Sequence, residues 1–180
     1  MIVEWAPIAE TETVPFMGDA LTAHLADRKG AVLHASCSAW NLLYRMLTEN
    51  GLPVGTAAFT KEGKPYFTDA DVCFSISHTK GVCAVAVSDR PVGVDIERRG
   101  RTYSPRAIEK ALTEKEKAAY DGDFTRIWGR KEAAAKMTGD GIKKYPDDLE
   151  TSRYSYSEQC IEFGGEEYWL IVCEASAENN

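Results

Sequence analysis

The chain has 180 residues, 44% of them hydrophobic and 27% charged, so it can bury a substantial core as one domain or two small lobes. Its net charge of −7 argues against non-specific nucleic-acid binding, which depends on neutralising phosphates. No apolar run approaches the roughly 20 residues of a membrane span, and residues 1–5 lack the basic and apolar regions of a secretory signal.

The N-terminal part of the chain is predicted to place helices between strands. Residues 1–15 are typical of an opening strand followed by a polar turn. Over residues 15–50 apolar side chains recur at spacings of three and four, which predicts helix, with an interruption at Gly30. A turn-rich loop at 61–65 precedes a short predicted strand at 72–77.

Two hairpins are predicted further along the chain. Residues 82–87 and 92–97 are β-branched runs joined by Ser-Asp-Arg-Pro, which favours a hairpin. A second hairpin is expected around Gly164 and Gly165. Together with the helices, these strands predict an α+β fold.

Two helices are predicted between the hairpins. Thr113 and Glu116 have the spacing of a capping box, in which each side chain bonds the other residue's backbone N–H. A longer helix is expected over residues 124–137, ended by Gly139 and Gly141. The chain's five cysteines form no Cys-x-x-Cys pair, which indicates reduced thiols in a cytoplasmic protein rather than structural zinc.

Acidic residues on a strand and on a helix are predicted to meet. Asp95 and Glu97 are two apart on a strand, so their carboxylates leave the same face. Trp128, Glu132 and Lys136 are four apart on the predicted helix and share one face. Hard oxygen ligands beside a cation suit Mg²⁺ and a pyrophosphate.

Four motifs in order resemble the 4′-phosphopantetheinyl transferase superfamily. Residues 93–97 (Gly-Val-Asp-Ile-Glu) and the Trp-x-x-Lys-Glu-Ala-x-x-Lys pattern at 128–136 resemble its signature, which residues 139–142 continue. Residues 74–79 resemble its Ser-His segment and residues 63–65 its Gly-Lys-Pro loop. Each motif is weak alone, and the order and spacing make the resemblance specific.

The resemblance implies a fold of two similar α+β lobes that form a pseudo-dimer. Residues 1–90 would form the N-terminal lobe and residues 91–180 the C-terminal lobe with the metal site, with the active site between them. The length lies between those of the two bacterial types. We interpret the chain as a shortened single-chain (Sfp-like) enzyme that acts as a monomer.

The resemblance also implies an activity. Such enzymes transfer the 4′-phosphopantetheine arm of coenzyme A to a serine of an apo acyl or peptidyl carrier protein and release adenosine 3′,5′-bisphosphate. Three carboxylates would bind Mg²⁺, with Mn²⁺ as the alternative ion: Asp95, Glu97 and Glu132. Asp95, Glu132 and Lys136 would be catalytic, with Glu132 as a candidate base. Coenzyme A would contact Lys64, Pro65, Ser77, His78 and Lys136.

Each of these residues also has a structural interpretation. Glu132 and Lys136 have the spacing of a surface ion pair contributing roughly 0.3–0.5 kcal/mol. His78 alone is more typical of a turn or packing residue. Glu116 matches another acidic position of the family, but a capping box explains it fully, and Lys131 could face either phosphate or solvent.

Two rival functions are weighed. Arg130, Lys131 and Glu132 resemble the Arg-Glu helix of Nudix hydrolases, but Ala135 and Lys136 stand where that helix needs further glutamates. The other rival is a non-catalytic domain that binds coenzyme A or a carrier. The presence of all three carboxylates with Lys136 argues against it.

Two basic clusters are candidates for binding anions. Four arginines follow the predicted metal strand, and they are either a solvated surface run or the landing site of an acidic carrier protein: Arg98, Arg99, Arg101 and Arg106. Candidates for the 3′-phosphate of coenzyme A lie early in the chain: Arg28, Lys29 and Arg45.

Overall fold

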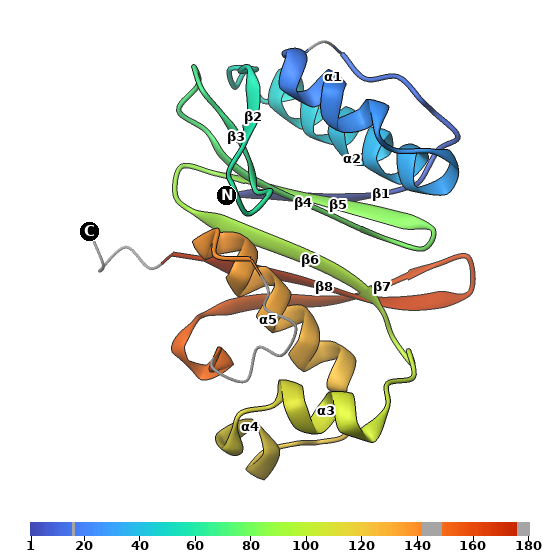
Figure 1. Cartoon of the computed structure of the whole chain (residues 1–180), viewed down its shortest axis with the longest axis vertical. Helices are drawn as coiled ribbons and strands as arrows, with labels where there is room; N and C mark the ends of the chain where they lie inside the picture. Colours follow the sequence, from blue (N-terminus) through green and yellow to red (C-terminus); the bar gives the residue numbers. More distant parts are fainter. Residues whose placement is uncertain (16, 142–148, 176–180) are drawn as a thin grey trace.

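A computed structural model describes residues 1–15, 17–141 and 149–175, and it has the predicted α+β composition (Figure 1). Two three-stranded antiparallel sheets form the centre, and a two-stranded hairpin stands beside the first of them. Within the described ranges, every helix is too short or too polar to cross a bilayer.

The first sheet is built from residues that precede position 90, in the order β1-β5-β4. Its strands, two helices and accompanying hairpin are β1 (Ile2–Pro7), α1 (Asp19–Ala26), α2 (Gly30–Glu49), β2 (Ala57–Phe59), β3 (Pro65–Phe67), β4 (Cys73–Thr79) and β5 (Val82–Ser88). The predicted helical stretch is thus divided just before Gly30, as the sequence indicates.

The second sheet follows in the chain, in the order β6-β8-β7. Its strands, helices and 3-10 turn are β6 (Val92–Arg98), α3 (Pro105–Ala111), α4 (Glu114–Ala118), α5 (Phe124–Thr138), the turn Thr151–Arg153, β7 (Tyr156–Phe163) and β8 (Glu166–Glu174). The capping box of Thr113 and Glu116, the end of α5 at Gly139, and the hairpin around Gly164 and Gly165 are confirmed. Ile142, at the end of the 139–142 motif, lies outside the described residues.

The two sheets share one connectivity. In each, a strand leads through helices to two further strands, and the last strand pairs antiparallel with both of the others. The shared order agrees with the expectation of two similar lobes. The lobe boundary and the pseudo-dimer remain predictions.

The core has helices outside and sheets inside. Figure 1 shows α1 and α2 over the first sheet and α5 over the second. On β5, Val85 and Val87 pack against α2, while Ala84 and Ala86 point the other way into a cluster with Val94 and other residues of the second sheet. Burial on both faces explains why β5 is a continuous apolar run rather than an alternating one.

The predicted hairpin between residues 82–87 and 92–97 is wrong. The described residues show β5 paired with β1 on one side and β4 on the other, so both of its edges are occupied before β6 begins. β6 therefore starts the second sheet and pairs with β8. The actual hairpin joins β4 to β5 through Lys80 and Gly81, and Gly81 has a φ of 93°, a backbone conformation that glycine adopts without strain.

Two serine side chains connect the sheets where β4 lies beside β6. Ser75 Oγ accepts a hydrogen bond from Val94 N at 3.0 Å, and Ser77 Oγ accepts one from Ile96 N at 3.4 Å. These hydroxyls satisfy buried backbone N–H groups of β6 that have no strand partner on this side. The contact brings the Ser-His segment beside the acidic strand.

Candidate active site where β4, β6 and α5 meet

The site is built on a close approach of α5 to the second sheet. A Cβ atom on Gly93 would lie 1.9 Å from the Ala133 carbonyl oxygen. One on Gly129 would lie 2.8 Å from Ile171 Cδ1 and 3.5 Å from Asp95 Oδ2. Glycine at both positions lets the helix lie against the strands, and this places Asp95 directly beside α5.

Asp95 is buried and asymmetrically bonded. Its Oδ1 atom accepts from Ser77 Oγ at 2.9 Å and from Lys136 Nζ at 2.7 Å. Its Oδ2 atom is buried without a hydrogen-bond partner among the described residues. A buried carboxylate oxygen left bare is costly, so the second oxygen is a vacant acceptor inside the protein.

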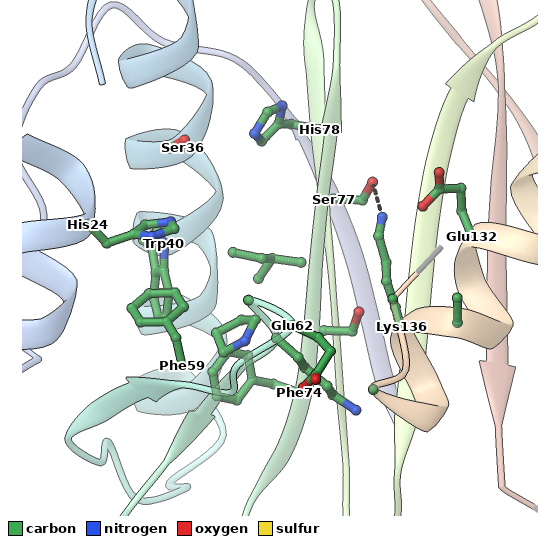
Figure 2. Close-up of a pocket in the computed structure, with 18 of the residues that line it drawn as sticks. His24, Ser36, Trp40, Phe59, Glu62, Phe74, Ser77, His78, Glu132 and Lys136 are labelled. Carbon is green, nitrogen blue, oxygen red and sulfur yellow. Dashed lines mark hydrogen bonds between the residues drawn. The ribbon is translucent and has the colours of Figure 1, made fainter. Parts of the chain in front are cut away.

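Lys136 crosses from α5 to the strands and holds Asp95. Its ammonium group lies 2.7 Å from Asp95 Oδ1, 2.8 Å from Ser77 Oγ and 3.1 Å from the Val94 carbonyl oxygen. These three acceptors match the three protons of an ammonium group. Figure 2 shows the bond between Lys136 and Ser77 at the pocket wall.

Glu97 and Glu132 complete the predicted group of carboxylates. Burial raises the pKa of Glu132 to about 7, and the charges of Asp95 and Glu97 add to this effect against Lys136. Burial and then the charge of Asp95 raise the pKa of Glu97, while Arg101 and Lys136 oppose the shift. The three carboxylates therefore lie near enough to repel one another, as their spacing predicted.

This acidic group fits a divalent cation in chemistry. It offers hard oxygen ligands, an unpartnered buried oxygen and a charge repulsion that a cation would relieve. Within residues 1–15, 17–141 and 149–175, no three His, Cys, Asp or Glu side chains already stand in the arrangement of a metal site.

A pocket of about 360 Å³ opens beside this group. Six of the residues predicted from the sequence line it: Lys64, Pro65, Ser77, His78, Glu132 and Lys136. Asp95 and Glu97 are absent from its lining, and Asp95 is joined to the pocket wall through Ser77 and Lys136. The structure thus brings the residues predicted to contact coenzyme A together with Glu132 around one cavity.

The pocket is lined by three cationic side chains, Arg28, Lys64 and Lys136, together with the carboxyl groups of Glu62 and Glu132. Desolvation, followed by the charges of Lys136 and Arg28, lowers the pKa of His78. Burial lowers the pKa of Lys64, whose Nζ donates to the Met137 carbonyl oxygen at 2.8 Å and so ties the 61–65 loop to the end of α5. Cationic groups converging from both sheets suit a ligand with several negative charges.

The first half of the chain supplies a wall that the sequence analysis missed. His24, Trp40 and Phe59 line the pocket opposite Lys136, and Figure 2 shows them across the cavity from it. The rings of His24 and Phe59 are stacked with centroids 4.1 Å apart. The sequence pattern around these three residues predicts only core packing. It does not indicate that the β2–β3 hairpin packs against α1, which is the contact that forms this wall.

One early basic residue reaches the pocket. Of the three candidates for the 3′-phosphate, Arg28 lines the cavity, whereas Lys29 and Arg45 are absent from its lining. Arg45 instead pairs with Glu4 at 2.8 Å.

Lys131 faces neither phosphate nor solvent, so both of its predicted orientations are wrong. It is fully buried, and its Nζ lies 2.8 Å from Glu116 Oε2. Glu116 also accepts hydrogen bonds from Thr151 N at 3.1 Å and Thr151 Oγ1 at 2.7 Å. Burial alone would raise the pKa of Glu116, but its bonds to Lys131, Thr113 and Thr151 outweigh burial and lower it. This pair joins α4 to α5.

The arginine segment, defined as Arg98, Arg99, Arg101 and Arg106, is partly neutralised within the chain. Three of its members form ion pairs, which are Arg98–Glu166 at 2.9 Å, Arg99–Glu167 at 3.1 Å and Arg101–Glu97 at 3.4 Å. The Arg101 pair touches the acidic group itself. The segment is therefore a mixed-charge surface beside the candidate site.

The part of the chain that carries the acidic group is similar to a known protein family. Residues 91–176 match the family model of the 4′-phosphopantetheinyl transferase superfamily. Residues 91–176, slightly less than half of the chain, are thus similar to this superfamily. The matched range contains Asp95, Glu97, Glu132 and Lys136, so the resemblance drawn from the motifs is confirmed.

Two curated relatives carry the superfamily name. The chain is 32% identical over 113 residues to the 4′-phosphopantetheinyl transferase HetI of Nostoc sp., covering 52% of this chain and 46% of the relative. It is 28% identical over 146 residues to a 4′-phosphopantetheinyl transferase of Bacillus subtilis, covering 68% of this chain and 65% of the relative. The matches thus span about half to two thirds of these relatives' length.

Proposed function

We propose that this chain transfers the 4′-phosphopantetheine arm of coenzyme A to a serine hydroxyl of an apo acyl or peptidyl carrier protein. The observation that carries the proposal is that a pocket lined by Arg28, Lys64 and Lys136 adjoins the Asp95–Lys136–Glu132 group, whose members lie within the range similar to the superfamily.

The pocket suits coenzyme A in charge and in shape. Arg28, Lys64 and Lys136 supply positive charge to its walls although the chain carries a net charge of −7. Pro65 and the aromatic wall offer an apolar surface against which the adenine ring of coenzyme A could pack. A nucleotide with several phosphates needs both kinds of contact.

Asp95, Glu97 and Glu132 are the residues that would hold Mg²⁺, with Mn²⁺ as the alternative. When bound, such an ion stabilises negative charge that develops on phosphoryl oxygens. Lys136 stays beside Asp95 and supplies a fixed positive charge at the wall of the pocket.

Glu132 is our candidate for the base. In the proposed reaction the carrier serine loses its proton to this carboxylate, its oxygen forms a bond to the attacked phosphorus, and the bond to adenosine 3′,5′-bisphosphate breaks. The leaving group departs with the electron pair of that bond. A base whose pKa is raised toward neutrality is suited to accept the proton.

The partner surface and the assembly are proposals as well. The arginine segment follows β6 directly, so a carrier docked there would present its serine close to Glu97. We infer a monomer, because both sheets contribute to one pocket within a single chain. A cytoplasmic location remains a prediction from the sequence.

The test is intact-mass spectrometry of an apo carrier protein incubated with this chain, coenzyme A and Mg²⁺. We expect the carrier to gain one phosphopantetheine, and we expect EDTA to abolish the gain. An unchanged carrier mass across acyl and peptidyl carriers, with all reagents shown to be active on a known transferase, would reject the proposal.

A further inference from the structure

Ser77 is the point at which the first sheet touches the acidic group of the second. It lies on β4, is 7% exposed, and contacts two side chains that come from β6 and α5. The resemblance assigns it to coenzyme A binding. Its hydrogen bonds point to another role.

The hydroxyl of Ser77 has no bonding capacity left over. A serine hydroxyl carries one donor and two acceptor lone pairs. The Lys136 ammonium donates to it at 2.8 Å and Ile96 N donates at 3.4 Å, so both lone pairs are occupied. The single proton must then point to Asp95 Oδ1, 2.9 Å away.

This bond determines how Asp95 is presented. Oδ1 receives the Ser77 hydroxyl and the Lys136 ammonium, whereas Oδ2 receives neither and is left without a described partner. Two donors on one oxygen fix the rotation of the carboxylate. The other oxygen stays available for a cation or for a reacting group.

The geometry points to Ser77 as a positioning residue that orients Asp95 and Lys136, rather than a ligand of coenzyme A. This inference rests on the proposed function, since it gives Asp95 the role of a cation ligand. Ser77 acts through Asp95 and Lys136, so its loss should change the orientation of these two side chains and the cation affinity of the acidic group.

Ser75 provides a matched control. It lies two residues away on the same face of β4, is 4% exposed, and bridges the sheets through Val94 N at 3.0 Å. It makes no described bond to Asp95 or Lys136. Ser75→Ala therefore removes a buried hydroxyl and a sheet bridge without disturbing the orientation of Asp95.

The experiment compares Ser77→Ala, Ser77→Thr and Ser75→Ala with the unmodified chain. Mn²⁺ affinity is measured by electron paramagnetic resonance, coenzyme A affinity by calorimetry without metal, and transfer by carrier mass. We expect Ser77→Ala to weaken Mn²⁺ binding and lower kcat at least tenfold, with the coenzyme A Kd within twofold. Ser77→Thr, which keeps the hydroxyl, should restore most of both losses. Ser75→Ala, which removes a pocket-lining hydroxyl but keeps every bond of Ser77, should leave the Mn²⁺ affinity within threefold.

The outcomes separate this inference from the proposed function. Normal transfer with unchanged Mn²⁺ affinity and kcat in Ser77→Ala overturns the positioning role alone, as does a tenfold weaker coenzyme A Kd. A chain that transfers nothing but shows the expected Mn²⁺ pattern loses only the proposed function. A chain that binds no Mn²⁺ overturns the positioning role, and one that also leaves the carrier mass unchanged overturns both.

Discussion

Lys136 and Asp95 form a charged pair whose members come from α5 and β6, and the Asp95 side chain is buried while that of Lys136 is 29% exposed. The spacing of Glu132 and Lys136 allowed a simple surface pair. The structure instead turns Lys136 across to the strand, where its charge offsets that of a buried carboxylate. The chemistry of the site therefore depends on the pairing of Lys136 with Asp95 rather than with Glu132 alone.

Asp95→Asn tests that dependence. The amide keeps the size of the side chain but removes the negative charge, so it should weaken both the hold on Lys136 and the affinity for a cation. We expect transfer to fall about 100-fold or more, as when one preorganised charge is lost from an active site. Circular dichroism and the thermal midpoint should show a folded protein.

Asp89→Asn is the matched control. Asp89 also lies near β6, but its side chain is 85% exposed, and its described contacts are an ion pair with Arg90 and a hydrogen bond from Ser88 Oγ. Its amide variant should retain transfer within twofold. Full activity in Asp95→Asn would remove Asp95 from the mechanism.

Gly93 controls how closely α5 approaches β6. Gly93→Ala would place a methyl group 1.9 Å from the Ala133 carbonyl oxygen, which is fixed in the helix backbone. We expect the helix to shift and the free energy of unfolding to fall by about 1–3 kcal/mol, the usual cost of overpacking. Urea denaturation measures the loss. A stability equal to that of the unmodified chain would mean that α5 is not held at this distance.

At the scale of elements, Lys131 and Glu116 pin α4 to α5. Lys131→Met leaves Glu116 buried without its cation, and breaking a buried pair in this way costs about 3–5 kcal/mol. The double variant Lys131→Met with Glu116→Gln removes both charges but keeps an oxygen that can accept from Thr113 and Thr151, and should recover a large part of that loss. Denaturant midpoints of the single and double variants measure the two losses of stability. Equal losses in both variants would contradict the pairing of Lys131 with Glu116.

The same pair predicts a pH dependence of stability. The pKa of Glu116 is lowered in the folded state, so its contribution is present above the ordinary glutamate pKa and is lost as pH falls through the folded pKa. Glu116→Gln should therefore be less stable than the unmodified chain at neutral pH, and the difference should shrink on acidification. Thermal midpoints measured from neutral to acidic pH test this. A difference that grows toward low pH has the wrong sign.

The elements show what the sequence could and could not predict. Helical periodicity and capping residues located α2, α4 and α5, because those signals are local. The partner of β5 was mistaken, since strand pairing depends on which edges are already occupied elsewhere in the sheet. The motif spacing foretold the meeting of Asp95 with Glu132 and Lys136. The aromatic wall of His24 and Phe59 could not be foretold, because it arises from the packing of a hairpin against a helix.

At the scale of the whole molecule, the two halves share a connectivity but supply different residues to the candidate site. The first sheet and its helices supply the aromatic wall, Arg28 and the Ser-His segment. The second supplies the carboxylates and Lys136, and it alone lies within the superfamily match. Neither half contains a complete site, because Ser77 and Asp95 must meet across the boundary between the sheets.

The charge of the molecule bears on how an acidic carrier would approach it. The net charge of −7 repels such a partner at long range, so a local basic surface would have to offset it. Reversing Arg98 and Arg106 together to glutamate should raise the KM for the carrier about tenfold and leave the Kd for coenzyme A unchanged. The effect should shrink at high salt, since it is electrostatic.

Arg45→Glu controls for a lost surface charge and a lost ion pair. Arg45 pairs with Glu4 on the first sheet and is not a lining residue of the pocket, so its reversal should leave the carrier KM within twofold. If Arg98 and Arg106 reversal changes the carrier KM no more than Arg45→Glu does, the arginine segment is a solvated surface. Three of its four arginines would then serve only in the ion pairs with Glu166, Glu167 and Glu97. A selective rise would instead place the carrier against the end of β6, next to Glu97.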